Sequence, residues 1–196
     1  MGDIRTYKGE ENWKFTELAE QSGREARAYF LWFKIQIDKR IEYLGGYLAE
    51  EKADCLLDYS EASLSDMWIW FRTCMEFVRG KENEAKQEKE DSSGSQQGDA
   101  SLEELYGILD MIEMDIAIYF AETLIHNHPQ LHWDYVKKRP KLYAYHQPVV
   151  KGFDDSDFFL LPWQIIETCA AGEDCYGEDN NIRDIYEVWE KHVIRA

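Results

Sequence analysis

Carboxylate and imidazole side chains gather in the second half of the chain, where Glu122, His126 and His128 follow one another at short spacing. The apolar periodicity from Ser101 to about His126 predicts a helix, which places Asp115, Glu122 and His126 within one narrow arc. A carboxylate beside an imidazole can hold a divalent metal ion or work as a general acid–base pair. The alternative is a solvated helix edge without a ligand, which such loose spacing favours.

Other signatures of catalysis are missing from the sequence. It has no His-Glu-x-x-His motif, phosphate-binding glycine loop, Gly-x-Ser-x-Gly motif or dinucleotide fingerprint. We therefore predict no catalytic residue and no bound cofactor. The four cysteines, of which Cys74 and Cys169 lie among apolar residues, form no Cys-x-x-Cys pair. We interpret them as reduced thiols and predict a cytoplasmic protein, because the sequence also has neither a signal-peptide core nor a membrane-spanning run.

The charge of the chain narrows the class of partner. Its 196 residues include 39 Asp and Glu against 22 Lys and Arg, a formal net charge of −17. Such a chain repels nucleic acid and anionic lipid, so we predict that it binds neither. One basic cluster, at residues 137–141, lies among aromatic residues, which we interpret as packing rather than a base-stacking surface. Long-range electrostatic attraction instead favours a basic protein as the partner.

Five residues are candidates for contact with such a partner. Trp32 and Trp70 lie off the main apolar stripes of two predicted helices, where an exposed ring can anchor an interface. Asp154, Asp155 and Asp157 form an acidic loop that lacks the glycine and terminal glutamate of an EF-hand. An acidic turn without calcium is therefore the interpretation that we keep for this loop.

The elements that must position these residues are mostly helical. Helical spacing of apolar residues predicts five helices, and alternating residues predict two short antiparallel strands. The sequence thus indicates a mainly α (α+β) fold, a compact helical domain with a small two-stranded ribbon. The expected helices are 24–50, 61–78, 101–126, 163–170 and 182–193, and the expected strands are 131–136 and 142–146.

One segment contains no aromatic and no branched aliphatic residue. Residues 80–100 are rich in charge at first and then in Ser, Gln and Gly, so they cannot bury enough surface to offset the entropy lost on ordering. We expect a flexible surface loop at about 81–100, with a frayed helix end at its start. The parts on either side should pack together as a single domain, 1–196.

Two stretches carry a resemblance to a known group of proteins. One runs from Arg40 through the Leu57-Asp58-Tyr59-Ser60 segment to Phe71, and the other from Tyr119 through His128-Pro129 to Phe153. Together they resemble a group of small, uncharacterised bacterial cytoplasmic proteins, helical with a strand pair. Some of these look like immunity proteins carried beside polymorphic toxins. The resemblance implies a binding protein and identifies no catalytic residue.

Three functions remain open from the sequence. The first is a non-enzymatic acidic binding protein, such as an immunity protein that neutralises a basic bacterial toxin. The second is a metal-dependent or acid–base enzyme that uses the Glu122 and His126 cluster. The third is an inhibitor that mimics nucleic acid, although the acids at 81–91 and 154–157 form a poor linear array. The sequence leaves the oligomeric state undetermined.

Overall fold

The computed structural model describes residues 4–10, 13, 18–91, 100–138, 141–155, 157–172 and 182–193. Within these ranges lie five α-helices and a two-stranded antiparallel sheet, which confirms the predicted mainly α fold with a small ribbon. None of the described helices is long and apolar enough to cross a bilayer. In chain order the elements are η1 (Ile4–Thr6), η2 (Leu18–Glu20), α1 (Gly23–Glu50), α2 (Glu61–Asp91), α3 (Ala100–Asn127), β1 (His132–Tyr135), β2 (Pro148–Lys151), α4 (Pro162–Ala170) and α5 (Ile182–Glu190).

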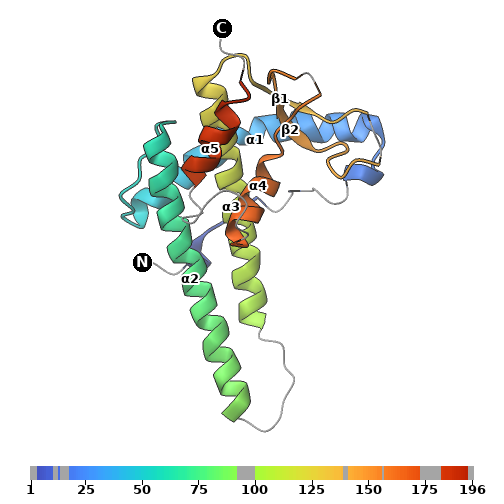
Figure 1. Ribbon diagram of the computed structural model, residues 1–196. Helices are drawn as coiled ribbons and strands as arrows, with labels where there is room; N and C mark the ends of the chain where they lie inside the picture. The colour runs from blue at the N-terminus through green and yellow to red at the C-terminus, as the bar shows by residue number, and fades with distance from the viewer. Residues whose placement is uncertain are drawn as a thin grey trace.

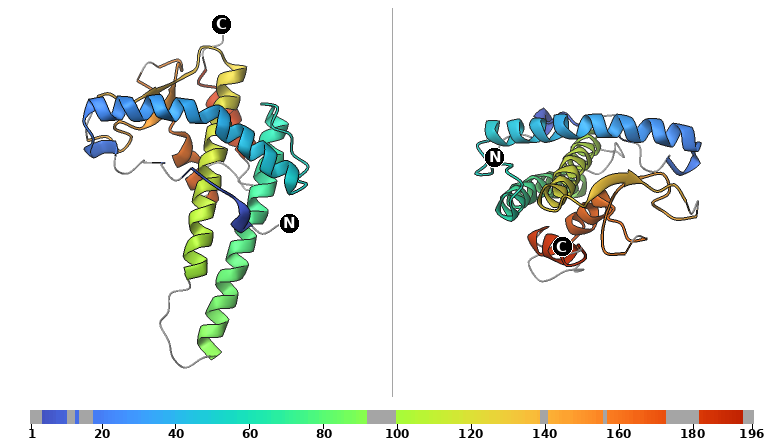
Figure 2. Two further views of the ribbon diagram at one scale, coloured as in Figure 1. Left: turned by 180° about the vertical axis from the view of Figure 1, so that it is seen from behind. Right: turned by 90° about the horizontal axis from the view of Figure 1, so that it is seen from above.

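Helices α2 and α3 form a long antiparallel pair that extends beyond the rest of the molecule (Figure 1). Seen from above, α1 crosses one side of this pair, while α4, α5 and the sheet lie on the other side (Figure 2). The upper half of α3 is therefore the middle layer, and every residue from Asp115 to Ala121 is buried. A helix enclosed in this way must be apolar on all faces, so any charged residue in it needs a partner.

Helix α1 begins with a capping box. The Ser22 side chain accepts a hydrogen bond from the Glu25 amide, and the Glu25 carboxylate accepts one from the Ser22 amide at 2.9 Å. The helix continues through Gly45 and Gly46 to Glu50, in agreement with the expected range of 24–50. The predicted apolar stripe is confirmed as the buried face: Ala26, Phe30, Phe33, Ile37, Ile41, Leu44 and Leu48.

Helix α2 is longer than the sequence indicated. It continues to Asp91, so the prediction of a loop is wrong for residues 81–91, while 92–99 lie outside the described residues. Lys81 and Lys86 form ion pairs with glutamates one turn away, at 2.8 and 2.7 Å, and Tyr106 on α3 donates to Glu82 at 2.9 Å. Good helix formers with such pairs keep a polar segment helical.

The ribbon has one strand where it was expected and one strand elsewhere. β1 pairs with Pro148–Lys151, and residues 142–146 form turns instead of the predicted strand. Val149 and Val150 are both fully buried because each faces a different apolar cluster, so this strand shows no alternation. The aromatic residues of β1 pack the ribbon on α1, with Trp133 4.9 Å from Phe33 between ring centroids.

A buried ion pair joins three segments in the middle of the molecule. Arg40 of α1 donates to both carboxylate oxygens of Asp115 on α3, with 2.9 Å between Nε and Oδ1. The Tyr7 hydroxyl donates to the same carboxylate, and Arg40 also donates to the Lys8 carbonyl at 3.1 Å. Burial alone would lower the pKa of Arg40, but Asp115 raises it, so the guanidinium stays charged. Asp115 is thus a structural group rather than part of a Glu122 and His126 site.

Candidate functional site

The three predicted metal ligands have separate partners. The indole of Trp133 donates to Glu122 at 2.5 Å, and the imidazole of His126 stacks on Tyr59 with 4.7 Å between ring centroids. His128 Nε2 lies 3.3 Å from a carboxylate oxygen of Glu190 on α5. Among the described residues, no three His, Cys, Asp or Glu side chains come together in a group able to hold a metal ion.

The two tryptophans expected to anchor a partner differ in exposure. Trp70 is only 8% exposed and packs near Tyr47 of α1, so the prediction that it lies on the surface is wrong. It was misjudged because Tyr47 of α1 packs against a second face of α2. Trp32 is half-buried, with its ring 5.3 Å from Trp13 and 5.2 Å from Tyr29.

The acidic loop is exposed at Asp154, Asp155 and Asp157. Asp154 accepts a hydrogen bond from the Asp155 amide at 2.9 Å, and Asp155 accepts one from the Asp157 amide at 2.8 Å. These contacts are those of a polar turn, in which carboxylates satisfy nearby backbone amides. The three aspartates stay candidates for a charged rim on a partner surface.

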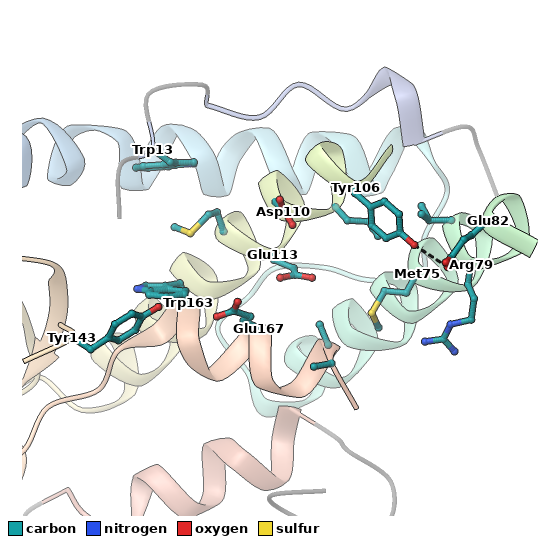
Figure 3. A pocket seen from close by; sticks show the side chains of 15 residues that line it. Trp13, Met75, Arg79, Glu82, Tyr106, Asp110, Glu113, Tyr143, Trp163 and Glu167 are labelled. Atoms are coloured by element: carbon teal, nitrogen blue, oxygen red, sulfur yellow. Dashed lines mark hydrogen bonds between the residues drawn. The ribbon is translucent and has the colours of Figure 1, made fainter. Parts of the chain in front are cut away.

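The structure brings together an acidic pocket that the sequence did not indicate. It is open, has a volume of about 740 Å³, and lies between α2, α3 and α4. We use the name acidic pocket for the space lined by Glu82, Asp110, Glu113 and Glu167 together with the aromatic side chains of Trp13, Tyr106, Tyr143 and Trp163 (Figure 3). Its volume falls within the range of about 300–1,000 Å³ that is typical of ligand pockets.

Helix periodicity explains how these residues reach one space. Asp110 and Glu113 are three residues apart on α3, and Trp163 and Glu167 are four residues apart on α4, so each pair shares a helix face. Helix α4 packs directly on α3, which brings the two faces together. Figure 3 shows the carboxylates of Glu113 and Glu167 turned toward each other, while Arg79 lies at the other end beside Glu82.

Three carboxylates of the acidic pocket lack a counter-charge. Glu82 is satisfied by Lys86 and by the Tyr106 hydroxyl. Within the described part of the chain, Asp110, Glu113 and Glu167 have neither an ion pair nor a side-chain hydrogen bond. Asp110 and Glu167 are exposed and Glu113 is half-buried. A bound cation would stabilise the negative charge that these groups give the pocket.

The aromatic wall next to these carboxylates is held in place. The Trp163 indole donates to the side-chain oxygen of Gln147 at 2.7 Å, and its ring lies 5.7 Å from the Tyr143 ring. Tyr143 is 57% exposed, so this wall faces the opening. An aromatic face beside a carboxylate is suited to a cation that has both flat apolar surface and hydrogen-bond donors.

Glu113 of the acidic pocket has a carboxyl with a raised pKa. Burial raises the pKa of its carboxyl, and the negative charges of Asp110 and Glu167 raise it further, to about 8. Burial also raises the pKa of Asp110. Glu113 is therefore largely protonated at neutral pH, and a cation that enters the pocket would favour its ionised form.

We expect Glu113→Gln to stabilise the protein at alkaline pH. The pKa of Glu113 lies near 4.5 in the unfolded chain and at about 8 in the fold, so the folded state holds this proton more tightly. The free energy of unfolding should then fall as pH rises from about 4.5 to 8. The variant lacks this loss. We expect its free energy of unfolding to exceed that of the wild type by about 1–2 kcal/mol at pH 8.5 and to change little at pH 5.

Urea denaturation of both proteins at the two pH values measures this difference. Glu42→Gln serves as the control, because Glu42 is exposed on α1 and outside the pocket. An equal gain at pH 5 and pH 8.5 would contradict the assignment of a raised pKa to Glu113.

The sequence contains one signal of this pocket, which is the presence of acidic residues in an otherwise apolar helix segment. The segment 108–120 is so apolar that each of its acids requires a reason, and these acids are Asp110, Glu113 and Asp115. Asp115 pairs with Arg40, whereas Asp110 and Glu113 line the acidic pocket. Glu167 carried no comparable signal, because it becomes relevant only once α4 packs on α3.

The three described cysteines, Cys55, Cys74 and Cys169, do not line the acidic pocket. Cys74 and Cys169 are buried, as predicted, and Cys55 is half-buried. Burial raises the pKa of Cys55 and of Cys74 to about 12, which keeps both as unreactive thiols. Cys175 lies outside the described residues.

Comparison of the chain with protein-family models, curated proteins and solved structures gives no match. Evidence on function therefore comes from the geometry of the acidic pocket and from the charge of the chain.

Proposed function

We propose that this chain is a non-enzymatic acidic protein that binds a basic protein, and that it serves as an immunity protein that neutralises a basic toxin in the bacterial cytoplasm. The observation that carries the proposal is the acidic pocket, where Asp110, Glu113 and Glu167 meet without a counter-charge among the described residues. The net charge of −17 supports the same class of partner, because it speeds the approach of a cationic surface.

The way in which the pocket carboxylates are held favours binding over catalysis. Catalytic carboxylates are held in place by hydrogen bonds from neighbouring groups, since chemistry requires a precise position. Glu113 and Glu167 have no such hydrogen bonds within the described residues, so they are free to adapt to a bound group. The enzyme based on Glu122 and His126 loses support because these side chains have separate partners.

The gene that neighbours the one for this chain provides the direct test. We expect it to encode a basic toxin whose expression arrests bacterial growth, and co-expression of this chain should restore growth. The purified pair should form a complex whose association rate falls about 10-fold or more between 50 and 300 mM NaCl, because screening removes the steering. Growth arrest that this chain does not relieve, or association unaffected by salt, would contradict the proposal.

Removal of the pocket charges should weaken that complex strongly. We expect Glu113→Gln/Glu167→Gln to raise the Kd for the basic partner by about 30-fold or more, because a charge buried in the interface loses its counter-charge. The matched control is Glu42→Gln/Glu76→Gln, which makes the same two substitutions at exposed positions of α1 and α2 outside the pocket.

Surface plasmon resonance on the three proteins measures both effects. The control should change the Kd by less than about 3-fold, mainly through the association rate. Equal losses for the two double variants would show that only the total charge matters. Asp154→Asn/Asp155→Asn, measured in the same series, tests whether the acidic loop also contacts the partner.

A further inference from the structure

On the premise of the proposed function, we propose that the acidic pocket receives one arginine side chain of the partner and that Glu113 releases a proton to solvent as the guanidinium enters. The step conserves charge and atoms: the O–H bond of the Glu113 carboxyl breaks, the proton leaves to water, and the carboxylate pairs with the guanidinium. The pocket would thus identify the partner by a single side chain and make its capture dependent on pH.

A guanidinium fits the pocket because one part of its lining is carboxylate and another part is aromatic. Glu167 and Trp163 lie one turn apart on the same face of α4, so a flat group that stacks on the indole meets the carboxylate at its edge. A guanidinium has this shape and offers parallel N–H donors to a carboxylate, whereas an ammonium is a compact, strongly hydrated point charge. Gln147 fixes the indole, which prepares the stacking surface in advance.

The release of a proton follows from the groups that face Glu113. The Glu113 carboxyl is surrounded by more negative than positive charge, and Arg79 lies at the far end of the pocket beside Glu82. A guanidinium between Glu113 and Glu167 reverses this balance and favours the carboxylate. Besides Glu113, the charged or titratable side chains that line the pocket within the described residues are Arg79 and Glu82 from α2, Tyr106 and Asp110 from α3, Glu167 from α4, and Tyr143.

Peptides with one central residue on a neutral background test the inference without the partner. The probes are Ac-Gly-Gly-Arg-Gly-Gly-amide and the same peptide with lysine or with citrulline, the neutral isostere of arginine. Two-dimensional ¹H–¹⁵N spectra of the full chain follow the indole N–H of Trp163, which should shift with the arginine peptide. We expect the arginine peptide to bind at least about 5-fold more tightly than the lysine peptide, and the citrulline peptide to leave the signal unchanged.

The pH dependence of the same titration tests whether Glu113 releases a proton when the peptide binds. With a pKa of about 8 for Glu113 in the free protein, the Kd for the arginine peptide should rise about 20-fold from pH 8.5 to pH 6.5. Glu113→Gln should bind more weakly at pH 8.5 and lose this pH dependence, whereas Glu42→Gln should retain it. Because arginine stays charged throughout, the change is assigned to the pocket.

Several outcomes would overturn the inference. They are citrulline binding as tightly as arginine, lysine binding as tightly as arginine, and a Kd that is equal at the two pH values. Any of them can occur while the complex with the neighbouring gene product still forms and still depends on salt, so the proposed function would survive. Conversely, arginine binding in the pocket without a basic protein partner would contradict the proposed function alone.

Discussion

Arg40→Met should lower the free energy of unfolding by about 3–5 kcal/mol, because it leaves a buried carboxylate without its counter-charge. Asp115 has no exposed surface, and Arg40 is only 9% exposed. Arg40 supplies the only positive charge that pairs with Asp115 among the described residues. The methionine side chain fills much of the volume of the arginine stem, so loss of charge rather than loss of packing should dominate.

The pH dependence of this variant separates the two causes. Without Arg40, burial keeps the pKa of the Asp115 carboxyl above its value in the unfolded chain. The folded variant then holds a proton that the unfolded chain releases, so its stability should fall as pH rises above about 4. We expect a clearly smaller loss at pH 5 than at pH 8, whereas a loss of packing would be equal at both.

Urea denaturation of the variant and the wild type at these two pH values measures the effect. Arg27→Met is the control, because Arg27 is exposed on the same helix and has no ion pair within the described residues. It should change the stability by no more than about 0.5 kcal/mol. A loss below about 1 kcal/mol for Arg40→Met at pH 8 would show that the buried pair is not needed.

Gly152→Ala should also destabilise the protein strongly, by about 3 kcal/mol or more. Gly152 follows β2 and has a φ of +105°, which side chains other than hydrogen rarely allow. A Cβ atom at this position would lie 2.2 Å from the carbonyl oxygen of Gln130, a backbone atom that cannot move aside as a side chain can. The substitution therefore forces apart the end of β2 and the segment that leads into β1.

Gly46→Ala is a control with the opposite expected sign. Gly46 lies inside α1, and no atom lies within 4 Å of the position that its Cβ would take. Because alanine restricts the unfolded chain and favours helix, this variant should gain about 0.5–1 kcal/mol. Thermal unfolding of the two variants checks both signs, and equal Tm values for them would contradict the strain assigned to Gly152.

The sequence alone determined the elements whose signals are local. The three-to-four spacing of apolar residues in α1 requires only neighbours along the chain, and these residues form the buried face of the helix in the structure. The net charge, on which the proposed class of partner rests, is likewise a sum over residues that does not depend on folding. Helix formation and total charge are properties that a sequence carries without its tertiary structure.

Tertiary structure decided every feature that depends on what covers a residue. Trp70 was predicted to be exposed and is buried by α1, and Val149 and Val150 form a strand without alternation because different clusters cover its two faces. The pair of Arg40 and Asp115 and the acidic pocket are of the same kind. Each joins residues from helices that are far apart in sequence, such as Glu113 and Glu167.

The physical reason is that burial and charge pairing act through space. A carboxylate in an apolar helix has the same local sequence signal whether it meets an arginine, as Asp115 does, or opens into a pocket, as Glu113 does. Its pKa, its contribution to stability and its role in binding are set by the charges and the water around it in the folded state. For this chain the sequence indicated an acidic helical protein, and only the packing of α4 on α3 brought Glu113 and Glu167 into one pocket.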